Sequence, residues 1–178
     1  MSINDQTMGT VLKEDGRWGL RYERFLNHPP EKVWAALTES DHLRHWMPCD
    51  IVGERKEGVD IELPFWPAQI ERYSIKEPVL HGKILVWDLY EVFEWTWDTD
   101  VLRWELEPVA DGTLLTLTTW LGKDVDIAKD AAAGYHVCLD QLIELLDTGT
   151  VGPFEDADVH RWEDRYTEAV AAVETRQG

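Results

Sequence analysis

The most informative stretch of the sequence is Gly134-Tyr-His-Val-Cys-Leu-Asp-Gln-Leu-Ile-Glu-Leu-Leu146. Its apolar residues recur at intervals of three and four, the spacing of one helix face, whereas Asp140, Gln141 and Glu144 point away. We predict a helix from about Asp126 to Asp147 with a C-cap at Gly149. The face consists of Tyr135, Cys138, Leu139, Leu142, Leu145 and Leu146. Such a face needs a surface to receive it, and a curved antiparallel sheet supplies one.

Four segments before this helix alternate between apolar and polar residues, as half-buried strands do. They span residues 83–90, 92–97, 101–107 and 113–120. The alternation gathers these side chains on one face: Phe93, Trp95, Trp97, Leu102, Trp104, Leu106, Leu115 and Leu117. Residues 9–27 add a hairpin that turns at Asp15-Gly16. One aromatic face and one polar face predict a sheet covered on one side.

Two short helices are predicted after the hairpin. Pro29 and Pro30 end its second strand and open the first helix, because proline tolerates the first helical turn. Ser40 or Asp41 can cap the second. Their apolar faces carry Val33, Trp34 and Leu37 in the first, and Leu43, Trp46 and Met47 in the second. The chain is thus predicted to have an α+β fold.

The pattern is weakest between residues 51 and 81, where glycines and prolines interrupt short strand candidates. We expect edge strands and mobile loops there. The apolar tip Phe65-Trp66-Pro67 has two interpretations: it tucks under the sheet, or it covers the mouth of a pocket.

The order of these segments resembles the SRPBCC (START/Bet v 1-like) superfamily, in particular the branch related to the C-terminal domain of the activator of heat shock protein 90 ATPase. The resemblance covers about residues 9–147 and rests on motifs in the family's order: Arg24-Phe-Leu-Asn-His-Pro-Pro-Glu-Lys-Val-Trp34, Asp41-His-Leu-Arg-His-Trp46, Gly82-Lys-Ile-Leu, Phe93-Glu-Trp-Thr-Trp97, Leu106-Glu-Pro108, Gly112-Thr-Leu-Leu-Thr-Leu117 and Gly134-Tyr135. It implies a helix-grip fold, in which six or seven strands wrap around a long C-terminal helix. Many relatives carry His after the Leu-Thr-Leu-Thr run, where this chain has Thr119 followed by Trp120. Tyr135 stands where Trp is common after the glycine.

The length of 178 residues fits one domain. We assign residues 1–152 to the helix-grip domain and residues 153–178 to an amphipathic helix packed on it. The stripe of this helix carries Val159, Trp162, Tyr166, Val170 and Val173, and it could instead contact a second copy or a protein partner.

A net charge of −18 makes nucleic acid and anionic membranes unfavourable partners. Cys49 and Cys138 form no CxxC pair and predict no disulfide framework. The first residues lack the pattern of a signal peptide, and no apolar run is long enough to cross a bilayer. A cytoplasmic location is expected.

The sequence offers little for catalysis or cofactors. His42, His45 and Cys49 have helical spacing, but a zinc site needs further ligands, so no metal is expected. Cys138 lies on the predicted buried stripe and fits a core residue. No glycine-rich phosphate loop is present, so we expect no nucleotide cofactor and assign no catalytic residue.

The leading hypothesis is therefore a small hydrophobic or aromatic ligand in a cavity between sheet and helix, with Tyr135 orienting it. The predicted contacts are Trp66, Phe93, Trp95, Trp97, Trp104, Leu115, Leu117, Tyr135, Leu139 and Leu142. Ten tryptophans could also fill the cavity, leaving a protein-interaction or chaperone-ATPase-activator-like module. An enzyme acting on a hydrophobic substrate is the least supported alternative.

Overall fold

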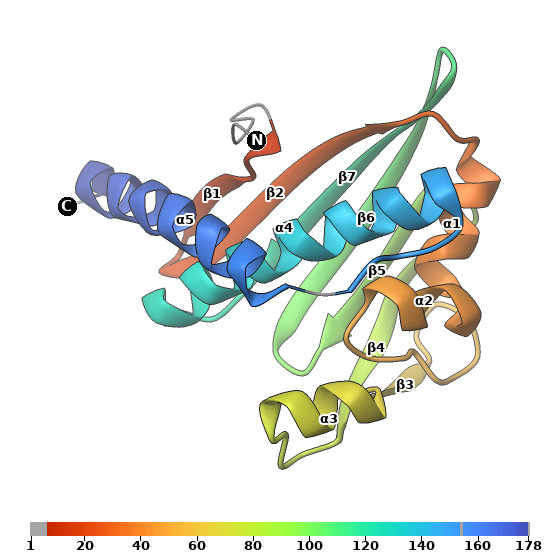
Figure 1. Ribbon diagram of the computed structural model, residues 1–178, viewed down its shortest axis with the longest axis horizontal. Coiled ribbons are helices and arrows are strands. Elements are labelled where there is room, and N and C mark those ends of the chain that lie inside the picture. Colours follow the sequence, from red (N-terminus) through yellow and green to blue (C-terminus); the bar gives the residue numbers. More distant parts are fainter. Residues whose placement is uncertain (1–6, 154, 178) are drawn as a thin grey trace.

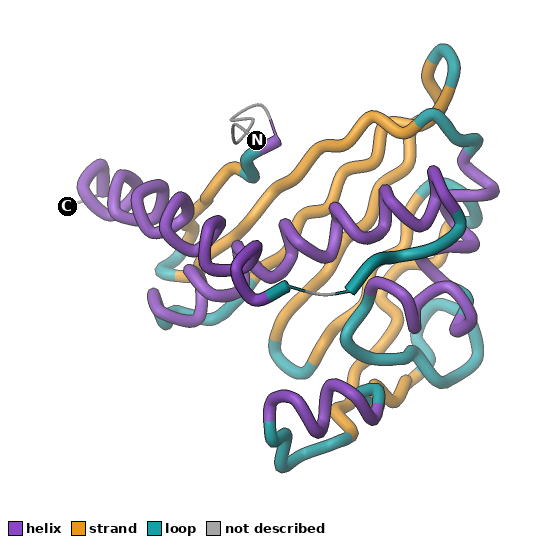
Figure 2. Tube along the Cα trace, in the orientation of Figure 1, coloured by secondary structure: helices purple, strands orange, loops and turns teal. Residues whose placement is uncertain are grey.

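A seven-stranded antiparallel sheet and a long helix across one of its faces form the body of the molecule (Figures 1 and 2). The computed structural model describes residues 7–153 and 155–177. In order, these contain β1 (Thr10–Glu14), β2 (Arg17–Leu26), α1 (Pro30–Thr38), α2 (Ser40–Trp46), β3 (Asp60–Pro64), α3 (Pro67–Tyr73), β4 (Val79–Asp88), β5 (Val92–Trp97), β6 (Asp100–Val109), β7 (Gly112–Trp120), α4 (Val125–Thr148) and α5 (Asp156–Gln177). The strand order is β1-β2-β7-β6-β5-β4-β3. The predicted α+β, helix-grip fold is confirmed.

The aromatic face predicted by alternation lies on β5, β6 and β7. Across β5 and β6, Phe93 pairs with Trp104 and Trp95 pairs with Leu102. Trp104 also pairs with Leu117 across β6 and β7. All five side chains are buried, and their rings and branched chains form the core beneath the helix layer.

The long helix α4 begins and ends at the expected kinds of residue. The Asp124 carboxylate accepts hydrogen bonds from the N–H groups of Asp126 and Ile127, which would otherwise lack partners in the first turn. Gly149 ends the helix with φ of 80°, a left-handed conformation that glycine adopts without a Cβ clash. The C-cap predicted from the sequence is confirmed.

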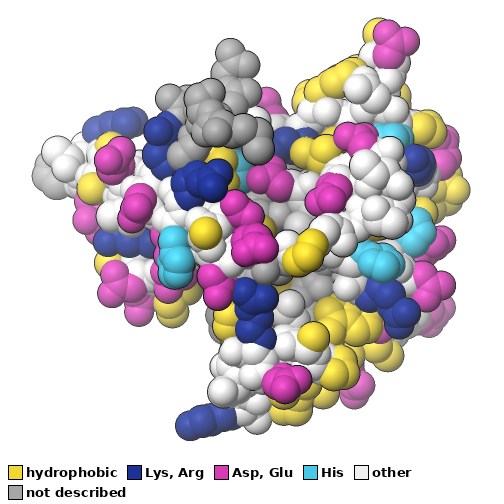
Figure 3. Space-filling model, in the orientation of Figure 1, with side chains coloured by type: hydrophobic (Ala, Val, Ile, Leu, Met, Phe, Trp, Pro, Cys, Tyr) yellow, Lys and Arg dark blue, Asp and Glu magenta, His cyan; other side chains and the backbone are white. Residues whose placement is uncertain are grey.

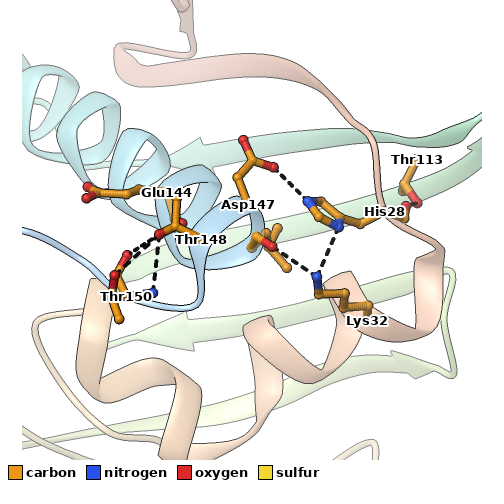
Figure 4. A network of polar contacts seen from close by, with 8 residues as sticks. His28, Lys32, Thr113, Glu144, Asp147, Thr148 and Thr150 are labelled. Carbon is orange, nitrogen blue, oxygen red and sulfur yellow. Dashed lines mark hydrogen bonds and ion pairs between the residues drawn. The ribbon is translucent and has the colours of Figure 1, made fainter.

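The C-terminal end of α4 is tied to the connection between β2 and α1 (Figure 4). Lys32 Nζ donates to the Leu146 carbonyl (2.9 Å) and to His28 Nδ1 (3.1 Å). His28 Nε2 contacts Asp147 Oδ1 at 2.7 Å, and Thr113 Oγ1 donates to the His28 carbonyl at 2.7 Å. These contacts place a cation where the helix exposes free carbonyls, and they fix α4 over the sheet.

Helix α5 packs along α4 and the edge strand β1. Trp162, Tyr166 and Val170 of its apolar stripe are buried in this contact, and Val159 and Val173 are partly buried. The stripe therefore lies against the chain's own α4, and a protein partner at α5 would meet its outer, polar face.

Residues 51–81 are more ordered in secondary structure than the sequence indicated. They form the edge strand β3, the first part of β4 and the helix α3, which the sequence did not predict. Pro67 opens α3 at its first turn, but none of its seven residues is buried, so it has no apolar periodicity to detect. Across the described ranges, no helix has both the length and the apolar character needed to span a membrane.

Candidate ligand-binding cleft

A cleft of about 560 Å³ opens beside α4, between α2, α3 and the start of α5. Val151 and Gly152, which follow α4, and Val159 of α5 complete its wall. In Figure 3, hydrophobic side chains gather beside α3, at the lower right of the view. The volume falls within the range of about 300 to 1,000 Å³ that small-molecule sites occupy.

One stripe of α4 forms the inner wall of the cleft. Its residues follow helical spacing: Ala131, Gly134, Tyr135, Cys138 and Gln141. Gly134 is the notable member, because a Cβ placed there would meet no atom within 4 Å. Glycine inside a helix costs roughly 0.5–1 kcal/mol relative to alanine. A side chain here would extend into open space, so glycine leaves this part of the cleft free.

The opposite wall is aromatic and is held together by hydrogen bonds and ring contacts. Trp66 Nε1 donates to the Met47 carbonyl at 2.9 Å, which joins the segment before α3 to the end of α2. The Trp97 ring lies 6.0 Å from the Phe65 ring, between centroids. Of the two interpretations of the apolar tip, Trp66 follows the second and lines the cleft, while Phe65 packs against the end of β5.

Helix α3 covers one side of the cleft through Ala68, Gln69 and Tyr73. It ends at Ser74, whose φ of 49° turns the chain back toward β4. An ion pair between Arg72 and Asp156 joins α3 to the first turn of α5. The cover is therefore anchored to the rest of the molecule by side chains at its rim rather than by a buried core.

The titratable groups of the inner wall are neutral near pH 7. Burial raises the pKa of Tyr135, and the neighbouring Thr119 hydroxyl acts in the opposite direction. Burial also raises the pKa of Cys138 to about 12. Tyr135 can thus donate a hydrogen bond, whereas the Cys138 thiol is a weak nucleophile because the thiolate is scarce.

Comparison with protein-family models identifies this architecture. The model described as activator of Hsp90 ATPase homolog 1-like protein matches residues 27–147. The chain belongs to this family. The resemblance found in the sequence is confirmed, and the match includes α1 to α3, all strands from β3 to β7 and α4 except its last residue.

Solved structures share the fold of this family member. A conserved protein of unknown function from Enterococcus faecalis aligns with a TM-score of 0.75 and 21% identity, over 92% of this chain and 91% of that one. CalU16 from Micromonospora echinospora aligns with a TM-score of 0.67 and 15% identity, over 92% of this chain and 96% of that one. A protein from Bordetella parapertussis aligns with a TM-score of 0.67 and 23% identity, over 94% of each chain. No curated protein matches the chain. Identities this low establish the common fold alone.

Of the ten predicted ligand contacts, the structure brings Trp66, Trp97 and Tyr135 to the cleft. The other seven lie in the core, at most 2% exposed, and do not line it: Phe93, Trp95, Trp104, Leu115, Leu117, Leu139 and Leu142. One of them supports the wall from behind, since the Trp95 ring stacks on the cleft residue Trp97 with centroids 6.0 Å apart.

Several cleft residues were not among the predicted contacts: Arg44, Met47, Gln69, Tyr73, Gln141 and Val159. Periodicity assigned Gln141 to the side away from the core, and that side borders the cleft. The strand and helix patterns report which side chains enter the core, whereas this cleft lies beside the core. The apolar tip at Trp66, the last aromatic residue of β5 at Trp97 and the polar Tyr135 of α4 were the sequence signals that pointed to it.

The flank of α4 that faces α5 is closed. The His136 ring stacks on Trp162 with centroids 3.6 Å apart, and its Nδ1 lies 2.8 Å from the Tyr166 hydroxyl. That hydroxyl accepts a hydrogen bond from the Gly9 N–H at 2.7 Å, so its own proton is available for His136. Arg24, on β2, is 6% exposed. We call this set the α4–α5 seam.

Burial lowers the pKa of His136 from 6.5 to about 3, and the positive charge of Arg24 adds to the shift. Asp140 is the acidic group nearest to this histidine, with 3.9 Å between Oδ2 and Nε2. His136 Nε2 and the Nε and Nη2 atoms of Arg24 are buried without a hydrogen-bond partner among the described residues. Neutral His136 fits this site, because a second cation beside Arg24 would be unfavourable.

A second hollow, of about 650 Å³, lies beside α1 and the β4–β5 turn. The carboxylates of Glu31, Glu39 and Asp41 line it. Arg55 also lines it, but its guanidinium already donates to three backbone carbonyls. The acidic lining makes this hollow less favourable than the cleft for an apolar molecule.

The histidines and cysteine considered for a metal lie in different surroundings. His45 lines the cleft, His42 Nε2 lies 3.7 Å from Glu39 Oε2, and Cys49 is buried. Among the described residues, no group of three His, Cys, Asp or Glu side chains is arranged to hold a metal ion.

Proposed function

We propose that this family member binds a small hydrophobic or aromatic molecule in the cleft beside α4. The observation that carries the proposal is Gly134, a glycine in the interior of a helix whose missing side chain leaves free space in the cleft wall. An alanine there would stabilise α4, so the chain has a less stable residue at a position where any side chain would occupy cleft space.

The chemistry of the walls supports a ligand of this class. Met47, Trp66, Trp97 and Val159 offer apolar and aromatic surface for a ligand to bury. Each fully buried apolar group contributes roughly 1.5–3 kcal/mol. Tyr135 offers a neutral hydroxyl that can orient a polar atom of the ligand, which fits a site where apolar contacts give affinity and a few polar groups give direction.

The test is a titration with phenylnaphthylamine, an uncharged aromatic probe that fluoresces in apolar surroundings. We expect saturable binding with quenching of tryptophan emission, because Trp66 and Trp97 line the site. Gly134→Leu should abolish binding and keep the fold, since it fills open space and favours helix. Glu168→Leu, on an exposed part of α5, is the matched control and should bind as the unmodified protein does. Equal binding by Gly134→Leu would place the probe elsewhere and contradict the proposal.

A protein partner is the second candidate, supported by the family description and by one surface feature. Leu89 and Tyr90, adjacent in the β4–β5 turn, are 52% and 40% exposed. Exposed neighbouring apolar side chains are typical of contact sites. Stimulation of Hsp90 ATPase activity by the chain, lost in a Leu89→Ser, Tyr90→Ser variant, would support this function; no stimulation by the unmodified chain would count against it.

A further inference from the structure

The charge of the cleft differs from the charge of the molecule. The chain has 35 acidic residues and only 17 basic ones. None of the described residues that line the cleft is Asp or Glu, whereas Arg44 and His45 line it from the last turn of α2. The hollow beside α1, in contrast, is lined by three carboxylates. The cleft is therefore a locally basic site on an acidic protein.

Arg44 is the strongest cation of this site, and it is available to a ligand. Its guanidinium carbon lies 5.9 Å from the centroid of the Trp66 ring, on the aromatic wall. No described carboxylate forms an ion pair with it, whereas Arg103 and Arg72 pair with Glu94 and Asp156. The structure thus shows a guanidinium held beside an apolar surface with its N–H donors unused by acidic groups.

The acidic groups nearest to the rim do not cancel this charge. Asp156, at the start of α5, is engaged by Arg72. Glu144 also lies near the rim, because its Oε1 accepts a hydrogen bond from the N–H of Gly152, a cleft residue, at 3.1 Å. Its side chain is exposed, so salt screens its effect on a bound anion, with a Debye length of about 8 Å at physiological ionic strength. At contact distance, the guanidinium of Arg44 determines the sign of the interaction.

We propose that the ligand of the cleft is an amphiphile with one carboxylate, such as an aromatic or fatty acid. Arg44 binds the carboxylate at the rim, and Trp66, Trp97 and Val159 contact the apolar body. This inference deepens the proposed function and depends on it. A guanidinium binds a carboxylate through two parallel N–H···O bonds, which would also fix the orientation of the ligand.

A competing explanation assigns Arg44 to the helix alone. Basic residues in the last turn favour a helix because they face its partial negative charge. On that account, Arg44→Gln changes stability slightly and leaves the preference between charged and uncharged ligands unchanged. The two explanations therefore differ in a measurable quantity.

The experiment compares two probes that share one skeleton: anilinonaphthalene sulfonate, as a stand-in for the anionic ligand, and its uncharged parent phenylnaphthylamine. Both are titrated into the unmodified protein, Arg44→Gln, Arg44→Lys and Arg21→Gln. Arg21 lies on β2, pairs with Glu23 and does not line the cleft, so its loss controls for net charge. Dodecanoate and dodecanol are then compared as competitors.

We expect Arg44→Gln to weaken sulfonate binding by about three- to tenfold and parent binding by less than about twofold. Arg44→Lys should retain part of the sulfonate affinity, and Arg21→Gln all of it. Dodecanoate should compete better than dodecanol, with an advantage that falls as salt rises. If the parent binds but Arg44→Gln weakens neither probe, the inference is wrong and the proposed function stands. If neither probe binds the unmodified protein, the proposed function itself is wrong.

Discussion

The two flanks of α4 belong to one helix but have opposite surroundings: one is covered by another helix, and the other lines an open cleft. On the flank toward α5, His136 is enclosed by Trp162 and Tyr166 in the α4–α5 seam. On the flank toward α2 and α3, the neighbouring residue Tyr135 lines an open cleft. Periodicity alone does not separate these flanks, since both border the same buried stripe. What separates them is the covering element: α5 buries its apolar stripe, whereas α3 buries no residue.

Removing the largest side chain of the seam should lower the stability of the protein more than any other change proposed below. Trp162 is buried and stacked on His136, so Trp162→Ala should lower the free energy of unfolding by about 3 kcal/mol. Urea unfolding measures this change. The affinity of the folded variant for phenylnaphthylamine should stay within about twofold of the unmodified protein. A variant of unchanged stability would show that α5 does not seal this flank.

The second largest expected effect is a loss of folding stability in acid, caused by the buried His136 of the seam. The pKa of His136 is 6.5 when unfolded and about 3 when folded, so below pH 6.5 the unfolded chain binds a proton that the folded chain does not. Stability from this group is therefore complete above pH 6.5 and lost as pH falls toward 3, by about 2 kcal/mol at pH 5.

Urea unfolding of the unmodified protein and of His136→Gln, each at pH 8 and pH 5, measures this contribution. The carboxylates titrate in both proteins, so the difference between the two pH dependences isolates His136. Identical pH dependences would contradict the expected pKa.

The same chemical change can be made on both flanks. Tyr166→Phe removes the hydroxyl that contacts Gly9 and His136, and it should cost about 1–2 kcal/mol because two buried groups lose their partner. Tyr135→Phe should cost less, about 0.5 kcal/mol, because the residue is only half-buried and its hydroxyl neighbours one other hydroxyl, that of Thr119. Paired thermal denaturation curves give both values. Equal costs would mean that the two hydroxyls lie in equivalent surroundings.

The smallest expected effect is a gain. Gly134→Ala should raise the free energy of unfolding by roughly 0.5–1 kcal/mol, because alanine favours helix and meets no atom within 4 Å. The same variant should bind phenylnaphthylamine more weakly, since the methyl group occupies the cleft. A variant that is more stable and binds equally well would show that the probe does not contact this part of α4.

Much of the fold could be predicted from the sequence because the core repeats its pattern. Phe93 and Trp95 alternate with polar residues on β5, and both are buried, so the sheet and the helix that covers it were predicted correctly. The predicted face of α4 was correct in part: Leu139, Leu142 and Leu146 are buried, whereas Tyr135, Cys138 and Leu145 are only partly buried. The core side of α4 includes His136 instead, which the apolar spacing did not select. Helix α3 could not be predicted in this way. Its side chains enter no core, and its position depends on contacts such as Arg72 to Asp156 that lie 84 residues apart.

The candidate site was less predictable than the fold for the same reason. The prediction placed the ligand between sheet and helix, where the structure has packed Trp104 and Leu139. The cleft instead forms where the ends of α2, α3 and the segment after α4 meet, and no local pattern encodes such a meeting. Arg44 has the spacing of an ordinary surface residue, so only the structure places it on the aromatic wall.

The seam also limits a motion of α4. A helix can rotate about its own axis without breaking its backbone hydrogen bonds, and each residue differs in direction from the next by about 100°. His136 is held between a stacked indole and a phenol hydroxyl, so rotation of α4 would break these contacts before it turned Tyr135 away from the cleft. The contacts on the closed flank thus prevent α4 from rotating and keep the open flank facing the cleft. The cleft wall is therefore oriented before a ligand binds, and binding does not carry the entropic cost of ordering this wall.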